Sequence, residues 1–181
     1  MKEIEIKAKL VNREGIMERL KALDCVFGPM IKQEDIVYVK NVGSLKEFCA
    51  NDVFLRIRVN DNKKVFFTLK KRDGNLEATE HEVEISSKGE MEQALFLMGY
   101  REAVQVNKTR VKTHFDGCEI CIDEVEDLGS FIEMEKLTET GDVKTIQEEM
   151  FKFFESIGVK REDRVFLGYD ILMLQKREQT I

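Results

Sequence analysis

Tryptophan is absent from this sequence of 181 residues, and proline occurs only once, at Pro29. With one proline and no low-complexity run, no stretch has the composition of a flexible linker, so we expect a single domain over residues 1–181. No segment approaches the roughly 20 consecutive apolar residues that a membrane helix requires, which argues against a membrane protein. The two histidines, His81 and His114, have no partner at the spacing of a metal site or a catalytic triad.

Cysteine is scarce as well, with Cys25, Cys49, Cys118 and Cys121 scattered along the chain. The last two form a C-x-x-C motif, but the surrounding CEICIDEV has the pattern of a strand, in which a spacing of three sends the thiols to opposite faces. We therefore expect four reduced thiols rather than a redox or zinc site. The N-terminal MKEIEIKAKL has charges where a secretion signal has its apolar core, so we expect a cytoplasmic protein.

Acidic residues are in slight excess over basic ones, which gives a formal net charge of −6. This balance disfavours nucleic acid and anionic membranes as partners. The 43% of apolar residues and 35% of charged residues are typical of a globular protein. A local group of cations can still bind phosphate, since the local field decides that interaction.

Charged residues recur at a spacing of two in several segments. In the first of these, Glu3, Glu5 and Lys7 alternate with apolar residues. Successive residues of a strand point to opposite faces, so each segment has one ionic and one apolar face. The later segments are Arg56-x-Arg58, Glu82-x-Glu84, Lys108-x-Arg110 and Glu133-x-Glu135.

The hydrophobic pattern predicts an α+β fold in which eight mostly antiparallel strands form a barrel or strongly curved sheet with covering helices. The strands are expected at 2–10, 31–41, 53–60, 64–72, 78–86, 103–115, 118–126 and 130–138, and the helices at 12–24, 88–98, 143–157 and 168–176. Residues 43–52 are expected to be a polar loop over the site. The helices are the only cover for the apolar strand faces, so the ionic faces point to solvent or to the barrel interior.

The sign of these faces favours a binding site over an ordinary solvated sheet. An ordinary exposed face mixes charges, because opposite charges across strands stabilise and like charges repel. Here each strand carries mostly one sign, which suggests separate acidic and basic patches. Carboxylates suit a hard divalent cation, and guanidinium and ammonium groups suit phosphate. The pattern therefore predicts a site for a metal-bound polyphosphate.

These motifs, in this order, resemble the CYTH family, the triphosphate tunnel metalloenzymes, whose first strand carries E-x-E-x-K. Glu3, Glu5 and Lys7 form that motif, and the resemblance continues nearly to the end of the chain. The further matches are the pairs given above, Lys70 in FFTLKK and Asp123 in CIDEVEDLGSFIEME. Three stretches look closest to the class IV adenylyl cyclase branch: MGYREAVQVNKTR, the L-G-x-F-x-E from Leu128 to Glu133, and GYDILML from Gly168.

The resemblance implies an eight-stranded antiparallel barrel with a charge-lined tunnel, Mg²⁺ or Mn²⁺ as cofactor, and ATP or another triphosphate as substrate. It assigns the metal to Glu3, Glu5, Asp123, Glu133 and Glu135, and the phosphates to Lys7, Arg56, Arg58, Lys70, Lys108 and Arg110. Glu82, Glu84 and Lys70 are the candidate catalytic residues, although the two glutamates could instead hold a second metal or be structural. The oligomeric state is open between monomer and homodimer.

Three functions are compatible with such a site. The first is a class IV adenylyl cyclase that converts ATP to cyclic AMP and pyrophosphate. The alternative is a triphosphatase that hydrolyses thiamine triphosphate, inorganic triphosphate or a nucleoside triphosphate. A non-catalytic polyphosphate or nucleotide sensor is less favoured, because binding an anion needs only the bases and leaves the acidic pairs without a role.

Overall fold

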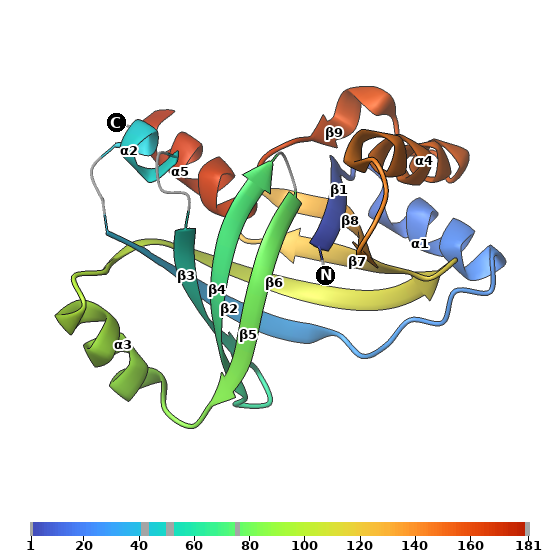
Figure 1. The fold of residues 1–181 in the computed structure, drawn as a ribbon. Coiled ribbons are helices and arrows are strands. Elements are labelled where there is room, and N and C mark those ends of the chain that lie inside the picture. The colour runs from blue at the N-terminus through green and yellow to red at the C-terminus, as the bar shows by residue number, and fades with distance from the viewer. Residues whose placement is uncertain (1, 41–43, 50–52, 75–76, 180–181) are drawn as a thin grey trace.

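The computed structural model describes residues 2–40, 44–49, 53–74 and 77–179. Within these residues, eight antiparallel strands form a closed barrel, with five α-helices around it (Figure 1). The barrel strands are β1 (Lys2–Lys9), β2 (Ile31–Val39), β3 (Val53–Asn60), β4 (Val65–Gly74), β5 (Glu77–Ile85), β6 (Arg101–Phe115), β7 (Cys118–Val125) and β8 (Gly129–Thr138). The helices are α1 (Arg13–Ala22), α2 (Leu45–Cys49), α3 (Lys88–Leu97), α4 (Val143–Ser156) and α5 (Tyr169–Gln179). The predicted fold class is therefore confirmed.

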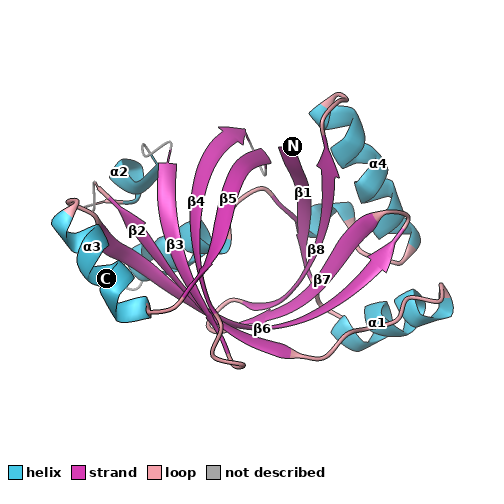
Figure 2. Cartoon of the chain, turned by 60° about the horizontal axis from the view of Figure 1, so that its bottom comes forward, coloured by secondary structure: helices cyan, strands magenta, loops and turns pink. Residues whose placement is uncertain are grey.

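The strands follow the order β5-β4-β3-β2-β6-β7-β8-β1, and pairing of β1 with β5 closes the ring. In the view of Figure 2 the strands curve around a common axis. The hairpin between β6 and β7 turns at Asp116 and Gly117, whose φ angles of 47° and 73° match the D-G turn signal in the sequence.

Two elements share the closing edge of β1. Among the residues that the structure describes, β5 pairs with β1 at Glu3 and Ile4, while the two-residue strand β9 (Arg164–Val165) pairs at Lys7 and Ala8. Between them, Gln147 of α4 donates a hydrogen bond from its Nε2 to the backbone oxygen of Glu5, at 3.1 Å. This edge is therefore held along the part of β1 that carries Glu3, Glu5 and Lys7.

The outer faces of the barrel are covered as the apolar pattern requires. On one side, Leu20 of α1 and Phe151 and Phe154 of α4 pack with Ile6 and Ile132 of β1 and β8 in a buried cluster. Figure 2 shows α1 and α4 outside this part of the barrel. The same alternation that buries Ile4 and Ile6 in this outer core turns Glu3, Glu5 and Lys7 inward.

Helix α5 packs against the inner face of the barrel at one end. Tyr169 and Met173 lie in a cluster with Val37, Val104 and Val106, which point inward from β2 and β6. Phe48 of α2 belongs to the same cluster. Apolar residues thus fill one end of the barrel, and the ionic faces begin beside them.

Two details differ from the sequence-based expectations. Residues 43–52 were expected to be a loop, but Leu45–Cys49 form α2, which Phe48 anchors in the apolar cluster; residues 43 and 50–52 lie outside the described part of the chain. The short strand β9 and the 3₁₀ turn before it, Arg161–Asp163, were not predicted, because so short a segment carries no periodic signal. None of the described helices has the length and apolar character needed to cross a lipid bilayer.

Gln147→Ala should lower the free energy of unfolding by about 1 kcal/mol, because it leaves the Glu5 carbonyl without its donor. Glu149→Ala, an exposed neighbour on the same helix, is the matched control and should change stability little. Urea unfolding followed by circular dichroism measures both. Equal stabilities of the two variants would contradict the role of Gln147 in closing the barrel.

Candidate active site

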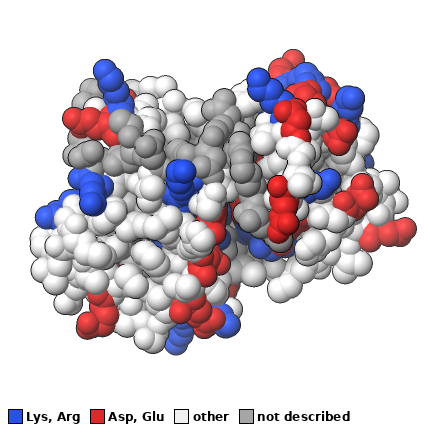
Figure 3. All heavy atoms as spheres, viewed as in Figure 1, with Lys and Arg blue, Asp and Glu red and all other residues white. Residues whose placement is uncertain are grey.

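The barrel encloses a cavity of about 430 Å³ that is lined by the ionic faces of the strands and by residues 166–171. On the face drawn in Figure 3, acidic side chains gather beside the hollow in the middle of the molecule. The structure brings most of the predicted site residues to the cavity wall: Glu3, Glu5, Lys7, Arg56, Arg58, Lys70, Glu82, Lys108, Arg110, Glu133 and Glu135. Asp123 lies directly behind this wall and is fully buried.

Three carboxylates from β1 and β8 form an acidic cluster. Oxygen atoms of Glu3, Glu5 and Glu135 lie within 4.8 Å of one another. Burial and the nearby Glu135 carboxylate raise the pKa of Glu3 to about 8. Burial also raises the pKa of Glu5 to about 7, although the ammonium of Lys7 opposes the shift. Both groups therefore keep their protons to a higher pH than an exposed glutamate does.

Deeper in the barrel, a buried ion-pair network joins β1, β6, β7 and β8. Arg110 donates from Nε to Asp123 at 2.7 Å and also binds Glu133, whose other oxygen lies 2.9 Å from the Nζ of Lys7. Lys108 completes the network through Asp123, at 3.3 Å. Although burial works against ionisation, Lys7 and Arg110 hold the pKa of Glu133 well below its ordinary value, and Lys108 and Arg110 lower the pKa of Asp123.

This network corrects the expectation that acidic and basic patches would be separate. Each strand carries mostly one sign, but antiparallel pairing places Arg110 opposite Asp123 and Lys7 opposite Glu133. Opposite charges therefore face each other at these two register positions. Lysine and arginine side chains already bind both carboxylates. That Asp123 and Glu133 are direct metal ligands therefore remains a prediction.

A second charged group lies on β3, β4 and β5. Arg56 lies 3.6 Å from Glu80 and 3.3 Å from Glu82, and Lys70 forms an ion pair with Glu80. Glu82 also accepts a hydrogen bond from Thr68, at 2.9 Å. Among the described residues, the buried Nε of Arg56 has no hydrogen-bond acceptor. This guanidinium therefore has capacity for a further anion.

Glu84 lies apart from the other predicted residues. It is exposed, pairs with Lys64 at 3.1 Å and does not contribute to the cavity wall. Glu84 lies two residues beyond Glu82, near the end of β5. This position explains why its side chain is separated from the cavity. Of the alternatives open for Glu84, this position favours a structural role.

Asp35 and Tyr169 are two of the site residues that the sequence reasoning missed. Asp35 on β2 receives two hydrogen bonds from Arg58, at 2.6 and 2.7 Å, and this guanidinium lowers the pKa of Asp35 despite its burial. Asp35 and Arg58 are paired in register across β2 and β3. Asp35 stands between Glu34 and the apolar run Ile36–Val39, without polar–apolar alternation, and a single acid in a strand is weak evidence.

The second missed residue is Tyr169, which the sequence placed in the helix expected at 168–176 without a role in the site. Its hydroxyl donates to Asp123 at 3.0 Å, and its ring lies under the ammonium groups of Lys7 and Lys108, 4.2 and 5.0 Å from the ring centroid. Burial and the Glu133 and Asp123 carboxylates raise the pKa of Tyr169, which keeps the hydroxyl a donor. A sequence pattern could not place this residue among charges from distant strands.

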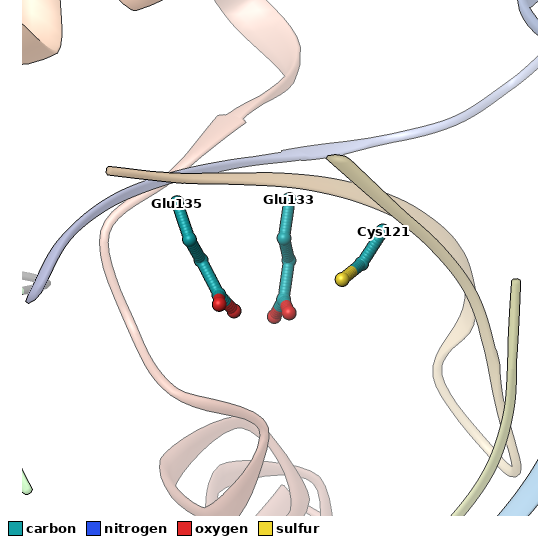
Figure 4. A group of neighbouring side chains, drawn as sticks. All are labelled: Cys121, Glu133 and Glu135. Carbon is teal, nitrogen blue, oxygen red and sulfur yellow. The ribbon is translucent and has the colours of Figure 1, made fainter. Parts of the chain in front are cut away.

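Cys121 also points into the barrel, beside Glu133 and Glu135 (Figure 4). Cys118 instead lies in the outer core, which confirms that the two thiols of C-x-x-C occupy opposite faces. Burial raises the pKa of Cys121, and its thiol donates to Glu119 at 3.6 Å. The protonated thiol is a poor metal ligand, so the oxygen cluster is the better candidate for a cation.

Without metal, the protein should become less stable as the pH rises from about 5 to about 8. Glu3 and Glu5, with pKa values of about 8 and 7, keep protons in the folded state that they lose in the unfolded state, so folding is favoured below their folded pKa values. Thermal unfolding in EDTA across this range measures the effect. Glu3→Gln should flatten the dependence, and Glu18→Gln, an exposed residue of α1, should not. If the stability of Glu3→Gln fell with pH as steeply as that of the wild-type protein, the raised pKa of Glu3 would be contradicted.

Comparison with known proteins agrees with this geometry. A sequence profile of the CYTH domain matches residues 1–169. A protein of Methanocaldococcus jannaschii that carries the name "putative adenylate cyclase" is 30% identical over 174 residues, which cover 93% of this chain and 97% of that protein.

Solved structures share the fold as well. A Pyrococcus horikoshii protein is 32% identical and superimposes with a TM-score of 0.82, covering 97% of this chain and 99% of its own. A Hippeastrum protein with a TM-score of 0.60 and 16% identity covers 92% of this chain and 90% of its own, and is described as a candidate adenylyl cyclase with a dominant triphosphatase activity. Because the profile and the M. jannaschii relative both extend over nearly the whole sequence, this protein belongs to the CYTH domain family.

Proposed function

We propose that this protein is a divalent-metal-dependent enzyme that converts ATP to cyclic AMP and pyrophosphate. The observation that carries the proposal is one cavity in which the acidic cluster of Glu3, Glu5 and Glu135 faces buried cations. The name of the M. jannaschii relative agrees with a cyclase. Acids for a cation and bases for phosphates within the same cavity are what a metal-bound triphosphate requires.

The acidic cluster fits Mg²⁺ or Mn²⁺. Both ions prefer carboxylate oxygens, and three such groups converge within 4.8 Å. The raised pKa values of Glu3 and Glu5 reflect burial and mutual repulsion, and a bound cation would relieve the repulsion. When bound there, the metal would neutralise phosphate charge and lower the pKa of an attacking hydroxyl.

The cations of the cavity would hold the triphosphate. The unsatisfied Nε of Arg56 is suited to a phosphate oxygen, and Lys70 lies between Arg56 and the acidic cluster. The remaining phosphate ligands would be Lys7, Arg58, Lys108 and Arg110, whose carboxylate partners fix their side chains before substrate arrives. Phosphoryl transfer depends mainly on such positioning and charge stabilisation.

In the cyclase reaction, the ribose 3′-hydroxyl releases its proton to solvent and its oxygen bonds to the α-phosphorus. The bond from the α-phosphorus to the bridging oxygen of the β-phosphate breaks, and pyrophosphate leaves. Glu82 would orient Arg56 and Thr68 beside the triphosphate, consistent with its contacts to both. Lys70 would stabilise negative charge on the phosphates, because Glu80 and the acidic cluster raise its pKa despite burial and keep it protonated.

Triphosphate hydrolysis is the second candidate. The same cations and carboxylates would bind the substrate, and water would attack the terminal phosphorus. The dominant triphosphatase activity described for the Hippeastrum protein is the specific observation in favour of this reaction on a similar fold.

Incubation of the purified protein with ATP and Mg²⁺ or Mn²⁺ should yield cyclic AMP and pyrophosphate in equal amounts, because one bond is broken at the α-phosphorus. Chromatography of the products separates the two candidates. Release of orthophosphate without cyclic AMP would overturn the cyclase proposal in favour of hydrolysis. Binding of ATP without any product would support the non-catalytic sensor.

Glu135→Gln should reduce metal-dependent turnover at least about ten-fold and weaken Mn²⁺ binding, because it removes one charge from the acidic cluster. Glu124→Gln is the matched control, since Glu124 lies on the neighbouring strand β7 but is exposed and does not line the cavity. Turnover and calorimetric metal binding are compared for both variants. If Glu135→Gln had the turnover and the metal affinity of the wild-type protein, the metal would have to bind at another site.

A further inference from the structure

Tyr169 brings an aromatic ring among the cations of the cavity. It is the first residue of α5, it is buried, and it contributes to the cavity wall. The centroid of its ring lies 4.2 Å from the Nζ of Lys7 on β1 and 5.0 Å from the Nζ of Lys108 on β6. Two cations that the proposed function assigns to the phosphates therefore share one ring.

This sharing has a physical reason. Two ammonium groups beside the same ring repel each other, and burial removes the water that would screen them. The face of an aromatic ring is the negative part of its quadrupole and attracts cations, most strongly where they are desolvated. The side chains of Lys7 and Lys108 are each only 3% exposed, so both contacts lie in such surroundings. The ring thus attracts both ammonium groups without adding a formal charge.

The carboxylate beside Lys108 is a shared partner. Oδ2 of Asp123 accepts hydrogen bonds from Arg110 at 2.5 Å and from the hydroxyl of Tyr169 at 3.0 Å. The Nζ of Lys108 lies 3.3 Å from the same oxygen, which is longer than the roughly 2.7–2.9 Å typical of a charged N–H···O bond. This carboxylate therefore holds Lys108 loosely, and the ring of Tyr169 is the further contact that fixes its ammonium group.

The fold sets the position of the ring independently of the two lysines. Phe131 of β8 meets the ring edge to face, with 5.1 Å between the centroids. Further along α5, Lys176 donates a hydrogen bond to the backbone oxygen of Asp127, between β7 and β8. Before α5, the pairing of β9 with β1 anchors the chain. Because the ring is anchored in this way, it can fix the side chains that contact it.

We propose that Tyr169 is a positioning residue whose ring holds the ammonium groups of Lys7 and Lys108 in place for the phosphates of the substrate. The inference rests on the proposed triphosphate site and names a residue on which its phosphate affinity depends. When a phosphate binds, each ammonium group must turn some of its three N–H donors from carboxylates to phosphate oxygens. The ring attracts the whole cation, so it keeps the group in place during this exchange.

Unnatural amino acids test the charge distribution of the ring at nearly constant shape. Phenylalanine and pentafluorophenylalanine are placed at position 169, because fluorine withdraws negative charge from the face of the ring. Binding of tripolyphosphate is measured by calorimetry in EDTA. Tyr169→Phe should bind within about three-fold of the wild-type protein, since only a hydrogen bond is lost. Pentafluorophenylalanine should weaken binding at least about ten-fold relative to phenylalanine, because two desolvated cation–π contacts are lost.

Nuclear magnetic resonance reports the positions of the two lysines directly. The ring current of Tyr169 should shift the methylene protons next to the ammonium groups of Lys7 and Lys108 upfield in the wild-type protein. Tyr169→Phe should keep these shifts, and Tyr169→Leu should abolish them.

The same pair of residues at position 100 is the matched control. The ring of Tyr100 lies 5.3 Å from the Nζ of Lys40, but Tyr100 does not line the cavity. Phenylalanine and pentafluorophenylalanine at this position should bind tripolyphosphate as the wild-type protein does. Circular dichroism and the melting temperature of each variant confirm that the fold is retained.

Three results would count against the inference, and only the last concerns the proposed function. Equal affinities with phenylalanine and pentafluorophenylalanine at position 169 would reduce the ring to packing and leave the triphosphate site intact. Absence of the upfield shifts from the wild-type protein would show, without any variant, that the ring does not hold the lysines. No binding of tripolyphosphate by the wild-type protein would refute the triphosphate site itself.

Discussion

Burying charged side chains inside a barrel is strongly unfavourable unless each charge lies close to an opposite one, and this constraint governs the arrangement of the whole interior. Desolvation of a single ion still costs several kcal/mol after relaxation. The barrel meets the constraint by register: Arg110 faces Asp123, Lys7 faces Glu133 and Arg58 faces Asp35 on neighbouring strands. The outer helices supply the apolar burial that allows the ionic faces to point inward.

The acidic cluster departs from this balance. Glu3, Glu5 and Glu135 come from adjacent strands, so the pairing that neutralises the rest of the interior here places acids together. Burial, together with the resulting repulsion, raises the pKa values of Glu3 and Glu5. A local imbalance inside an otherwise compensated interior is the physical sign of a place for a cation.

The C-terminal segment joins the separate parts of the site. β9 occupies the edge of β1 that β5 leaves unpaired, and Tyr169 then reaches Asp123 in the interior. Phe166 lies between these two anchors along the chain and lines the cavity. The segment is thus both a part of the barrel closure and a wall of the proposed substrate site.

The sequence by itself determined the strands, the helix caps and the inward direction of most charged side chains, because strand alternation and capping are local properties of the chain. Asn12, Ser87 and Asp142, residue types that favour helix N-caps, accept N-cap hydrogen bonds, and the E-x-E-x-K of β1 points inward. Only the tertiary structure decided which charges neutralise one another and which remain as an acidic cluster, since strand register depends on pairing between distant segments. It also decided the places of Asp35, Tyr169 and Phe166, whose neighbours in space lie far away along the chain.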